Sequence, residues 1–180
     1  MSLELRRRFC DYDLLNVYQD TTPEMREEVI AMWRRNNILP AGVDPAERAK
    51  QIALIVTDPD SNIVGVTTAY KDIYPFHPTS ERPQKPYYFF RFFLDRAGRV
   101  PELYKIMANE TFAMLRDREK RLAGQSANPP VGMAIITENR KLMRPGMKQK
   151  FRRNGYVLVA DDGYGHDVYL RHFRENEEAF

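Results

Sequence analysis

The sequence has little cysteine, little net charge and no long apolar run, and each of these shortages excludes a class of protein. Cys10 is the only cysteine among 180 residues, which excludes an intramolecular disulfide and a cysteine-rich metal site. The three histidines are scattered without ligand spacing, so we expect no metal site. No apolar stretch is long enough to span a membrane, and the first residues lack the apolar segment of a secretory signal. We therefore expect a cytoplasmic protein without a membrane partner.

The composition is that of a globular chain. Hydrophobic residues make up 43% of the sequence and aromatic residues 12%. A length of 180 residues suits one domain with a sizeable core, and we expect a single α/β domain over residues 1–180. The net charge of +3 permits an anionic ligand but does not by itself indicate nucleic-acid binding.

The most informative stretch runs from Pro86 to Leu122. Residues 86–94 are almost all apolar, which predicts a central strand covered on both faces. A bend at 95–100 follows, and a long helix begins at Pro101. We expect free backbone N–H groups at this bend, beside Arg96 and Arg99, to favour an anion such as a phosphorylated ligand. An ordinary strand-to-helix connection with two solvated arginines remains the alternative.

The other elements follow from caps, turns and alternation. Hydroxyl or acidic caps before a proline predict helices from Thr22-Pro23 and from Asp44-Pro45. A further helix is expected from Pro145 to Asn154, where Gly155 ends it. Residues 73–85, with three prolines, are expected to form an exposed loop. Strands are expected in part of 9–18 and at 51–57, 63–72, 132–137, 156–160 and 167–170.

This order of elements resembles the GNAT superfamily of N-acetyltransferases. The resemblance implies a mixed, mostly antiparallel central sheet flanked by helices on both faces. In that family the strand before the bend leads into a Gln/Arg-x-x-Gly-x-Gly/Ala loop, whose N–H groups hold the pyrophosphate of an acyl-coenzyme A. The matching segment here is 96–101, which implies that acetyl-CoA or another acyl-CoA binds. The implied cofactor-binding residues are Phe93, Leu94, Arg96, Gly98, Arg99, Val100 and Asn139.

A second family motif concerns proton transfer. An asparagine follows the next strand, as Asn139 does here, and the helix after it ends in Tyr-x-x-x-Gly-Phe, where the tyrosine protonates the departing thiolate. The corresponding residues are Phe151, Gly155 and Tyr156. Phenylalanine cannot donate a proton, so another group or water supplies it, or no acyl transfer occurs.

Three residues are candidates for catalysis. Glu138, at the end of the strand at 132–137, is placed to accept the proton of the acceptor amine, although a surface ion pair would also explain it. Arg91 interrupts an apolar strand, which indicates either a structural ion pair or a site for an anionic acceptor or acyl group. Tyr88 could donate a proton or stack on substrate, or simply belong to the core.

Six basic residues lie between Lys141 and Arg153, with no acidic residue among them. They could hold the phosphates of the ligand, contact an RNA or DNA backbone, or form a solvated helix face.

We therefore predict an acyl-CoA-dependent N-acyltransferase that transfers directly to an amine on a small molecule or peptide. One alternative is an inactive GNAT-fold binding module that uses the basic helix. Another is an enzyme similar to the acyl-homoserine-lactone synthases, which carry an Arg-Phe pair like Arg91-Phe92 but have a glutamate where Tyr88 stands. A homodimer is left open.

Overall fold

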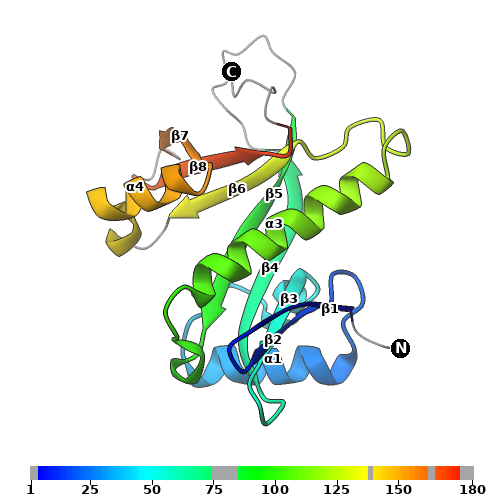
Figure 1. Cartoon of the computed structure of the whole chain (residues 1–180), viewed down its shortest axis with the longest axis vertical. Coiled ribbons are helices and arrows are strands. Elements are labelled where there is room, and N and C mark those ends of the chain that lie inside the picture. The colour runs from blue at the N-terminus through cyan, green and yellow to red at the C-terminus, as the bar shows by residue number, and fades with distance from the viewer. Residues whose placement is uncertain (1–3, 74–84, 138–139, 162–164, 175–180) are drawn as a thin grey trace. The chain divides into compact units, whose positions relative to one another are not determined.

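The computed structural model describes residues 4–73, 85–137, 140–161 and 165–174. Its strands form one eight-stranded sheet in the order β1-β2-β3-β4-β5-β6-β8-β7 (Figure 1). The predicted mixed, mostly antiparallel sheet is confirmed, because all strand pairings are antiparallel among β1 to β4 and among β6 to β8, whereas β5 pairs with β6 in parallel. The strands are β1 (Glu4–Phe9), β2 (Tyr12–Asn16), β3 (Ile52–Thr57), β4 (Ile63–Ile73), β5 (Pro86–Leu94), β6 (Gly132–Thr137), β7 (Val157–Asp161) and β8 (Asp167–His172). The helices are α1 (Pro23–Arg35), α2 (Pro45–Ala49), α3 (Leu103–Arg121) and α4 (Pro145–Arg153), with short 3-10 turns η1 (Arg96–Gly98) and η2 (Arg140–Met143).

The chain divides into two compact units, which are described separately here. The N-terminal unit contains residues 1–69 and 91–115, and the C-terminal unit contains residues 70–90 and 116–180. Strands β4 and β5 and helix α3 each contribute residues to both units. A single domain over the whole chain stays a prediction.

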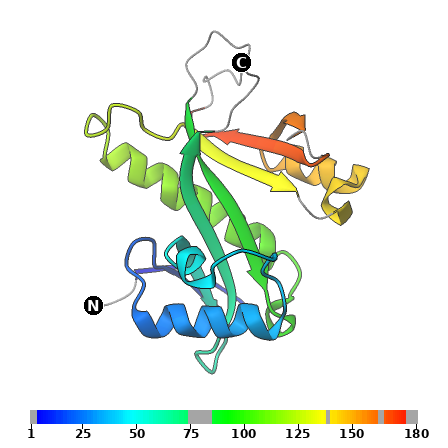
Figure 2. The ribbon, with the colours of Figure 1, turned by 180° about the vertical axis from the view of Figure 1, so that it is seen from behind.

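Helices cover both faces of the sheet in the N-terminal unit. On one face, Met32 and Trp33 of α1 pack with Ile55 of β3 in a fully buried cluster. On the other face, Leu54 packs with Leu103, at the start of α3. Figures 1 and 2 show the two opposite sides of these strands, with α3 in front in the first view and α1 in front in the second.

The helix starts of this unit form as their sequences predict. The Thr22 hydroxyl accepts a hydrogen bond from the backbone N–H of Met25 at 3.3 Å, and Pro23 is the first residue of α1. The Asp44 carboxylate accepts from the N–H of Ala46 at 2.8 Å in the same way. Caps of this kind stabilise a helix by about 1 kcal/mol, because they satisfy donors that have no partner inside the helix.

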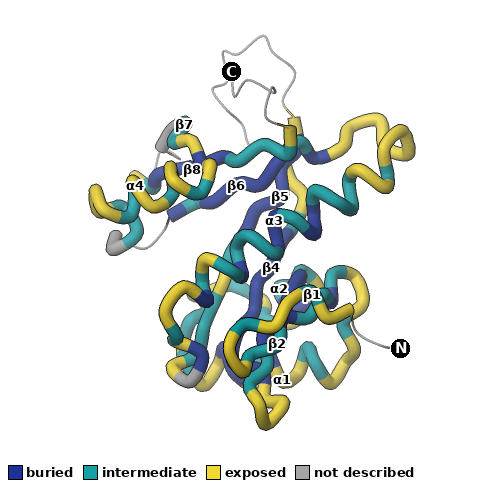
Figure 3. Tube along the Cα trace, in the orientation of Figure 1, coloured by how far each residue is buried: buried dark blue, intermediate teal, exposed yellow. Residues whose placement is uncertain are grey.

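The C-terminal unit is built on the buried first half of β5. Tyr88 and Phe89 are paired with Met133 and Ala134 of β6, and β6 continues into the antiparallel pairs β6–β8 and β8–β7. Figure 3 colours each residue by its burial and shows buried residues along β5, β6 and β8, whereas α4 has no buried residue. The aromatic strand is therefore buried as expected as far as Phe90, which is 3% exposed.

Strand β1 was not predicted, and its sequence explains why. Three consecutive arginines, which are unusual in a strand, occupy its centre. In the structure each has an acidic partner, at 3.0 Å for Arg6, 3.1 Å for Arg7 and 2.6 Å for Arg8. Charged residues on an edge strand hinder association with a further strand. The same charges interrupt the alternation of apolar and polar residues by which a strand is predicted from sequence.

Two other differences are small. Helix α3 begins at Leu103 and not at Pro101, and the 3-10 turn η2 was not expected. The predicted loop at 73–85 lies almost entirely outside the described residues. Within the described ranges, no helix is long and apolar enough to cross a membrane.

Candidate functional site

The bend between β5 and α3 is held against the neighbouring strand of the N-terminal unit. The N–H of Asp95 donates to the carbonyl of Val64 in β4 at 2.8 Å. Gly98 is buried, and a Cβ atom added there would lie 3.0 Å from the same carbonyl oxygen. The bend therefore approaches β4 so closely that only glycine fits at this position without a shift.

The expectation of free N–H groups throughout the bend is wrong. Those of Gly98, Arg99 and Val100 donate to the carbonyls of Asp95, Arg96 and Gly98, at 3.0, 3.3 and 2.9 Å. The N–H of Arg96 donates to the Asp95 carboxylate at 2.5 Å. The bonds of Gly98 and Arg99 are those of the 3-10 turn η1, in which each N–H donates to the carbonyl three residues earlier. Val100 donates two residues back, and Arg96 donates to a side chain. An anion at the bend would rely mainly on side-chain charge and on α3.

Glu102 has a left-handed backbone, with φ +66°, immediately before α3. This conformation costs a residue with a Cβ roughly 1–2 kcal/mol and is the one that glycine adopts freely. Glu102 therefore adopts a backbone conformation that its side chain disfavours. Its carboxylate forms an ion pair with Lys105 at 3.2 Å.

Arg96 and Arg99 are both exposed at the start of α3. Neither has an ion-pair partner in the part of the chain that the structure describes. The first turn of this 19-residue helix contains no acidic residue, so the positive end of its dipole adds to the two guanidinium charges. Binding of an anion beside these two guanidinium groups stays a prediction.

The last residues of β5 point to opposite sides of the strand, as its alternation requires. Phe93 packs against the α1 cluster, whereas Leu94 packs with Leu103 and Met107 of α3, next to the half-buried Val100.

The exposed aromatic ring near the bend was not predicted. Phe92 is 41% exposed although the aromatic residues before it in β5 are buried. Its ring stacks on that of Tyr104, with centroids 6.5 Å apart and an angle of 25° between the planes. A continuous apolar run hid this change of environment, and only the proximity to the bend could have indicated it.

Two candidate catalytic residues lie on β5, one in each unit. Arg91 is half-buried in the N-terminal unit. Tyr88, 3% exposed, donates its hydroxyl hydrogen to the Glu119 carboxylate of α3 at 2.5 Å within the C-terminal unit. A role for Tyr88 as a proton donor stays a prediction and requires that this hydrogen bond break. Glu138 and Asn139 lie outside the described residues.

The second family motif is found at the end of α4. Gly155 has φ +79° and ends the helix, as predicted. The ring of Phe151 stacks on Tyr169 of β8, with centroids 4.5 Å apart. The Tyr169 hydroxyl donates to Asp167 at 3.2 Å, and burial together with this carboxylate raises the pKa of Tyr169 to about 12. A phenol so weakly acidic is a poor proton donor, so Tyr169 does not replace the hydroxyl that Phe151 lacks.

The neighbouring aromatic residue is no better as an acid. Tyr156 is buried beneath the Arg171 guanidinium, which lies 5.8 Å from its ring centroid. Burial raises the pKa of the Tyr156 hydroxyl well above its ordinary value, although Arg171 opposes the shift. Tyr156 therefore stays protonated and serves packing.

No protein-family model matches the sequence, and no curated protein sequence matches it significantly. Several solved structures do match the fold. A bacterial toxin is 15% identical, with a TM-score of 0.56 and 90% of each chain covered. A mutant AtaT toxin, bound to acetyl-CoA and the C-terminus of the antitoxin AtaR, is 10% identical with a TM-score of 0.56, over 89% of this chain and 93% of the other. An acetyltransferase of the GNAT family from Streptococcus pneumoniae is 13% identical with a TM-score of 0.54, over 89% and 96%. The chain therefore has the GNAT fold that its sequence resembles.

Proposed function

We propose that this protein is an acyl-CoA-dependent N-acyltransferase that transfers the acyl group directly to an amine. The observation that carries the proposal is the bend after β5, where Arg96 and Arg99 are exposed shortly before the positive end of α3 and have no ion-pair partner among the described residues. Such a field suits the pyrophosphate of an acyl-CoA. The exposed ring of Phe92, which stacks on the half-buried Tyr104 of α3, offers an apolar surface to the uncharged part of the same ligand.

The other assigned residues have supporting roles in the proposal. The backbone of Phe93 and Leu94 would polarise the thioester carbonyl, and Gly98 and Val100 would shape the loop. We assign Asn139 a contact to the acyl-CoA. We assign Arg91 a contact to an anionic acceptor or acyl group. The acceptor itself is an amine on a small molecule or a peptide.

The reaction requires no covalent intermediate on the protein. The amine attacks the thioester carbonyl, a C–N bond forms, and the C–S bond breaks with the electron pair leaving on sulfur. Glu138 accepts the proton that the amine loses. Because Phe151 carries no hydroxyl and the Tyr169 hydroxyl is buried and donates to Asp167, the leaving thiolate takes its proton from water.

A second candidate function has its own support. Phe151 and the internally bonded N–H groups of the bend also suit a GNAT-fold binding module without turnover. The two functions separate when binding and turnover are measured independently.

The first test is the thermal midpoint with and without excess acetyl-CoA, with free CoA and ATP as controls. A ligand at about a hundred times its Kd adds about 2.7 kcal/mol to the stability of the native state, which raises the midpoint by several degrees. We expect a rise with acetyl-CoA that R96A/R99A abolishes. The matched variant K120A/R121A, which removes two charges at the other end of α3, should keep it.

Acyl transfer is then measured on a panel of amines by release of free CoA. Turnover supports the enzyme, and a midpoint rise without turnover on any amine indicates a protein that binds the ligand without catalysis. The absence of any rise at saturating acetyl-CoA would overturn the acyltransferase and leave the binding module, which does not need this ligand.

A further inference from the structure

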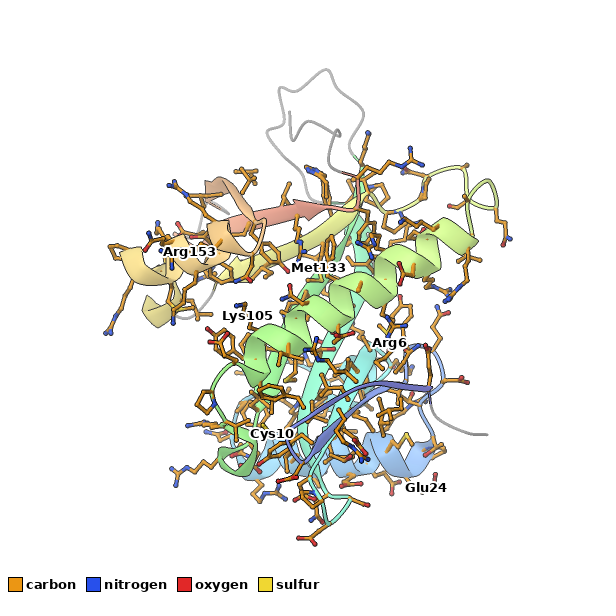
Figure 4. All side chains as sticks on the ribbon, in the orientation of Figure 1. Arg6, Cys10, Glu24, Lys105, Met133 and Arg153 are labelled. Carbon is orange, nitrogen blue, oxygen red and sulfur yellow. The ribbon has the colours of Figure 1, made fainter. Side chains whose placement is uncertain are left out.

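Helix α4 presents a group of basic side chains that no carboxylate in the described part of the chain neutralises. Arg144, Lys150, Arg152 and Arg153 are exposed. Lys150, Arg152 and Arg153 are spread around the solvent side of the helix and Arg144 lies at its N-cap, and we call these four residues the basic face of α4. Within the described ranges, none of the four has a carboxylate partner. Figure 4 labels Arg153 and shows nitrogen-tipped side chains extending outward from this helix.

The basic face contrasts with the fifth cation of the same helix. Lys148 donates to the buried Asp167 carboxylate of β8 at 2.8 Å. Phe151, on the same helix, stacks on Tyr169 of that strand. Lys148 and Phe151 thus attach α4 to the sheet, and the basic face is the part left for solvent or a partner.

Helix stability does not account for this arrangement. Cations in the last turn, where Lys150, Arg152 and Arg153 lie, favour a helix through its dipole. Arg144, however, is the N-cap residue at the positive end and makes no side-chain capping bond. Spacings of three and four residues also bring like charges together, each pair costing a few tenths of a kcal/mol. A partner with negative charge would convert this repulsion into binding.

The residue types of the basic face indicate which kind of anionic partner it binds. We propose that the basic face of α4 binds the phosphate backbone of double-stranded nucleic acid. A single strand is bound through aromatic rings on which bases stack, and the one aromatic ring of α4, Phe151, is covered by Tyr169. An acidic peptide would need apolar anchors, and the exposed residues of α4 are the basic face with Gln149, Pro145 and Gly146. Charge without anchors or stacking rings is the requirement for contact with a phosphate backbone.

The proposal is tested without acyl-CoA, so its failure is distinguishable from failure of the proposed acyltransferase. Fluorescein-labelled 20-base-pair duplexes of one sequence, as DNA and as RNA, are titrated with the protein by anisotropy between 50 and 200 mM KCl. The variant R144Q/K150Q/R152Q/R153Q removes the face but keeps long polar side chains. The control R34Q/K120Q/R121Q/R174Q removes four exposed charges elsewhere. Both variants are first compared with the wild type by thermal unfolding.

We expect both duplexes to bind the wild type and the control with similar affinity, and the α4 variant to bind at least tenfold more weakly at 50 mM KCl. The slope of log K against log salt should become shallower by about three to four, since each phosphate contact contributes about 0.9. Equal binding by the α4 variant, or equal loss in the control, would overturn the proposal. Tighter binding of a single strand or of polyglutamate than of the duplexes would also overturn it.

Discussion

Arg35, at the end of α1, donates a hydrogen bond from Nη2 to Oδ2 of Asp95, at the start of the bend, over 3.0 Å. The other carboxylate oxygen of Asp95 accepts from the N–H of Arg96. One side chain thus joins a helix of the N-terminal unit to the bend and begins the turn η1. Asp95 is a residue that the motif comparison passed over, although it fixes the residues beside which a phosphate would bind.

This relationship predicts a pH-dependent stability. The hydrogen bond from Arg35, with that from the Arg96 N–H, lowers the pKa of Asp95 below its ordinary value, against the opposing effect of burial. A lowered pKa in the folded state contributes stability that is complete above the ordinary value of about 3.9 and is lost as the pH falls through the folded value. Asp95→Asn should therefore lower the thermal midpoint by a few degrees at pH 7, and the difference should shrink below about pH 4. A difference that stayed constant down to pH 2.5 would show that the charge of Asp95 does not contribute.

Two glycines provide a matched pair of substitutions. Gly98→Ala places a Cβ 3.0 Å from the Val64 carbonyl oxygen and 3.2 Å from Leu94 Cδ2, so it should destabilise the protein by about 1–3 kcal/mol. Gly146→Ala, in the first turn of α4, meets no atom within 4 Å and should be neutral or stabilising by up to about 1 kcal/mol. Urea unfolding of both variants measures the contrast. Similar free energies of unfolding for the two would show that the bend moves away from β4 without cost.

A buried pair of hydroxyls joins β4 to α3. The Oγ1 atoms of Thr67 and Thr111 lie 3.0 Å apart, and neither residue is exposed. Thr67→Val or Thr111→Val alone should cost about 1–3 kcal/mol, because each leaves a buried hydroxyl without its partner. The double variant should cost less than the sum of the two, since it removes both polar groups. Chemical unfolding of the four proteins measures the coupling, and strictly additive costs would contradict it.

Substitution of Tyr88 tests whether its hydroxyl donates a proton in the reaction or only stabilises the fold. Tyr88→Phe removes the hydroxyl that donates to Glu119 and should lower the free energy of unfolding by about 1–2 kcal/mol. We expect kcat for any acceptor amine to change less than about threefold. A loss of 10²–10⁴ in kcat with normal KM would instead support the proton-donor role predicted from sequence. Tyr12→Phe, a half-buried tyrosine in β2, is the control.

Local sequence patterns predicted the elements whose ends carry a clear capping or turn signal. The caps Thr22 and Asp44 and the C-terminal Gly155 placed three helix ends correctly, because each satisfies backbone geometry that few other residues can. The central strand at 86–94 followed from its run of apolar residues, which only Arg91 interrupts.

The site depended on features that are not local. The closure of the bend N–H groups depends on the turn η1, and the left-handed backbone fell on a glutamate, where no sequence rule places it. The exposure of Phe92 and the contact of Phe151 with Tyr169 arise from tertiary packing, so composition and spacing could not reveal them.

The N–H groups from Asp95 to Val100 that donate inside the protein have a consequence for hydrogen exchange. A bend whose amides are already bonded keeps its shape in the ligand-free protein, so these amides should exchange slowly before any ligand arrives and change little afterwards. Association then requires little ordering of the chain, and its rate should be set by electrostatic encounter with Arg96 and Arg99. In the proposed acyltransferase the bend would be a preformed receptor and not a loop that folds around its ligand.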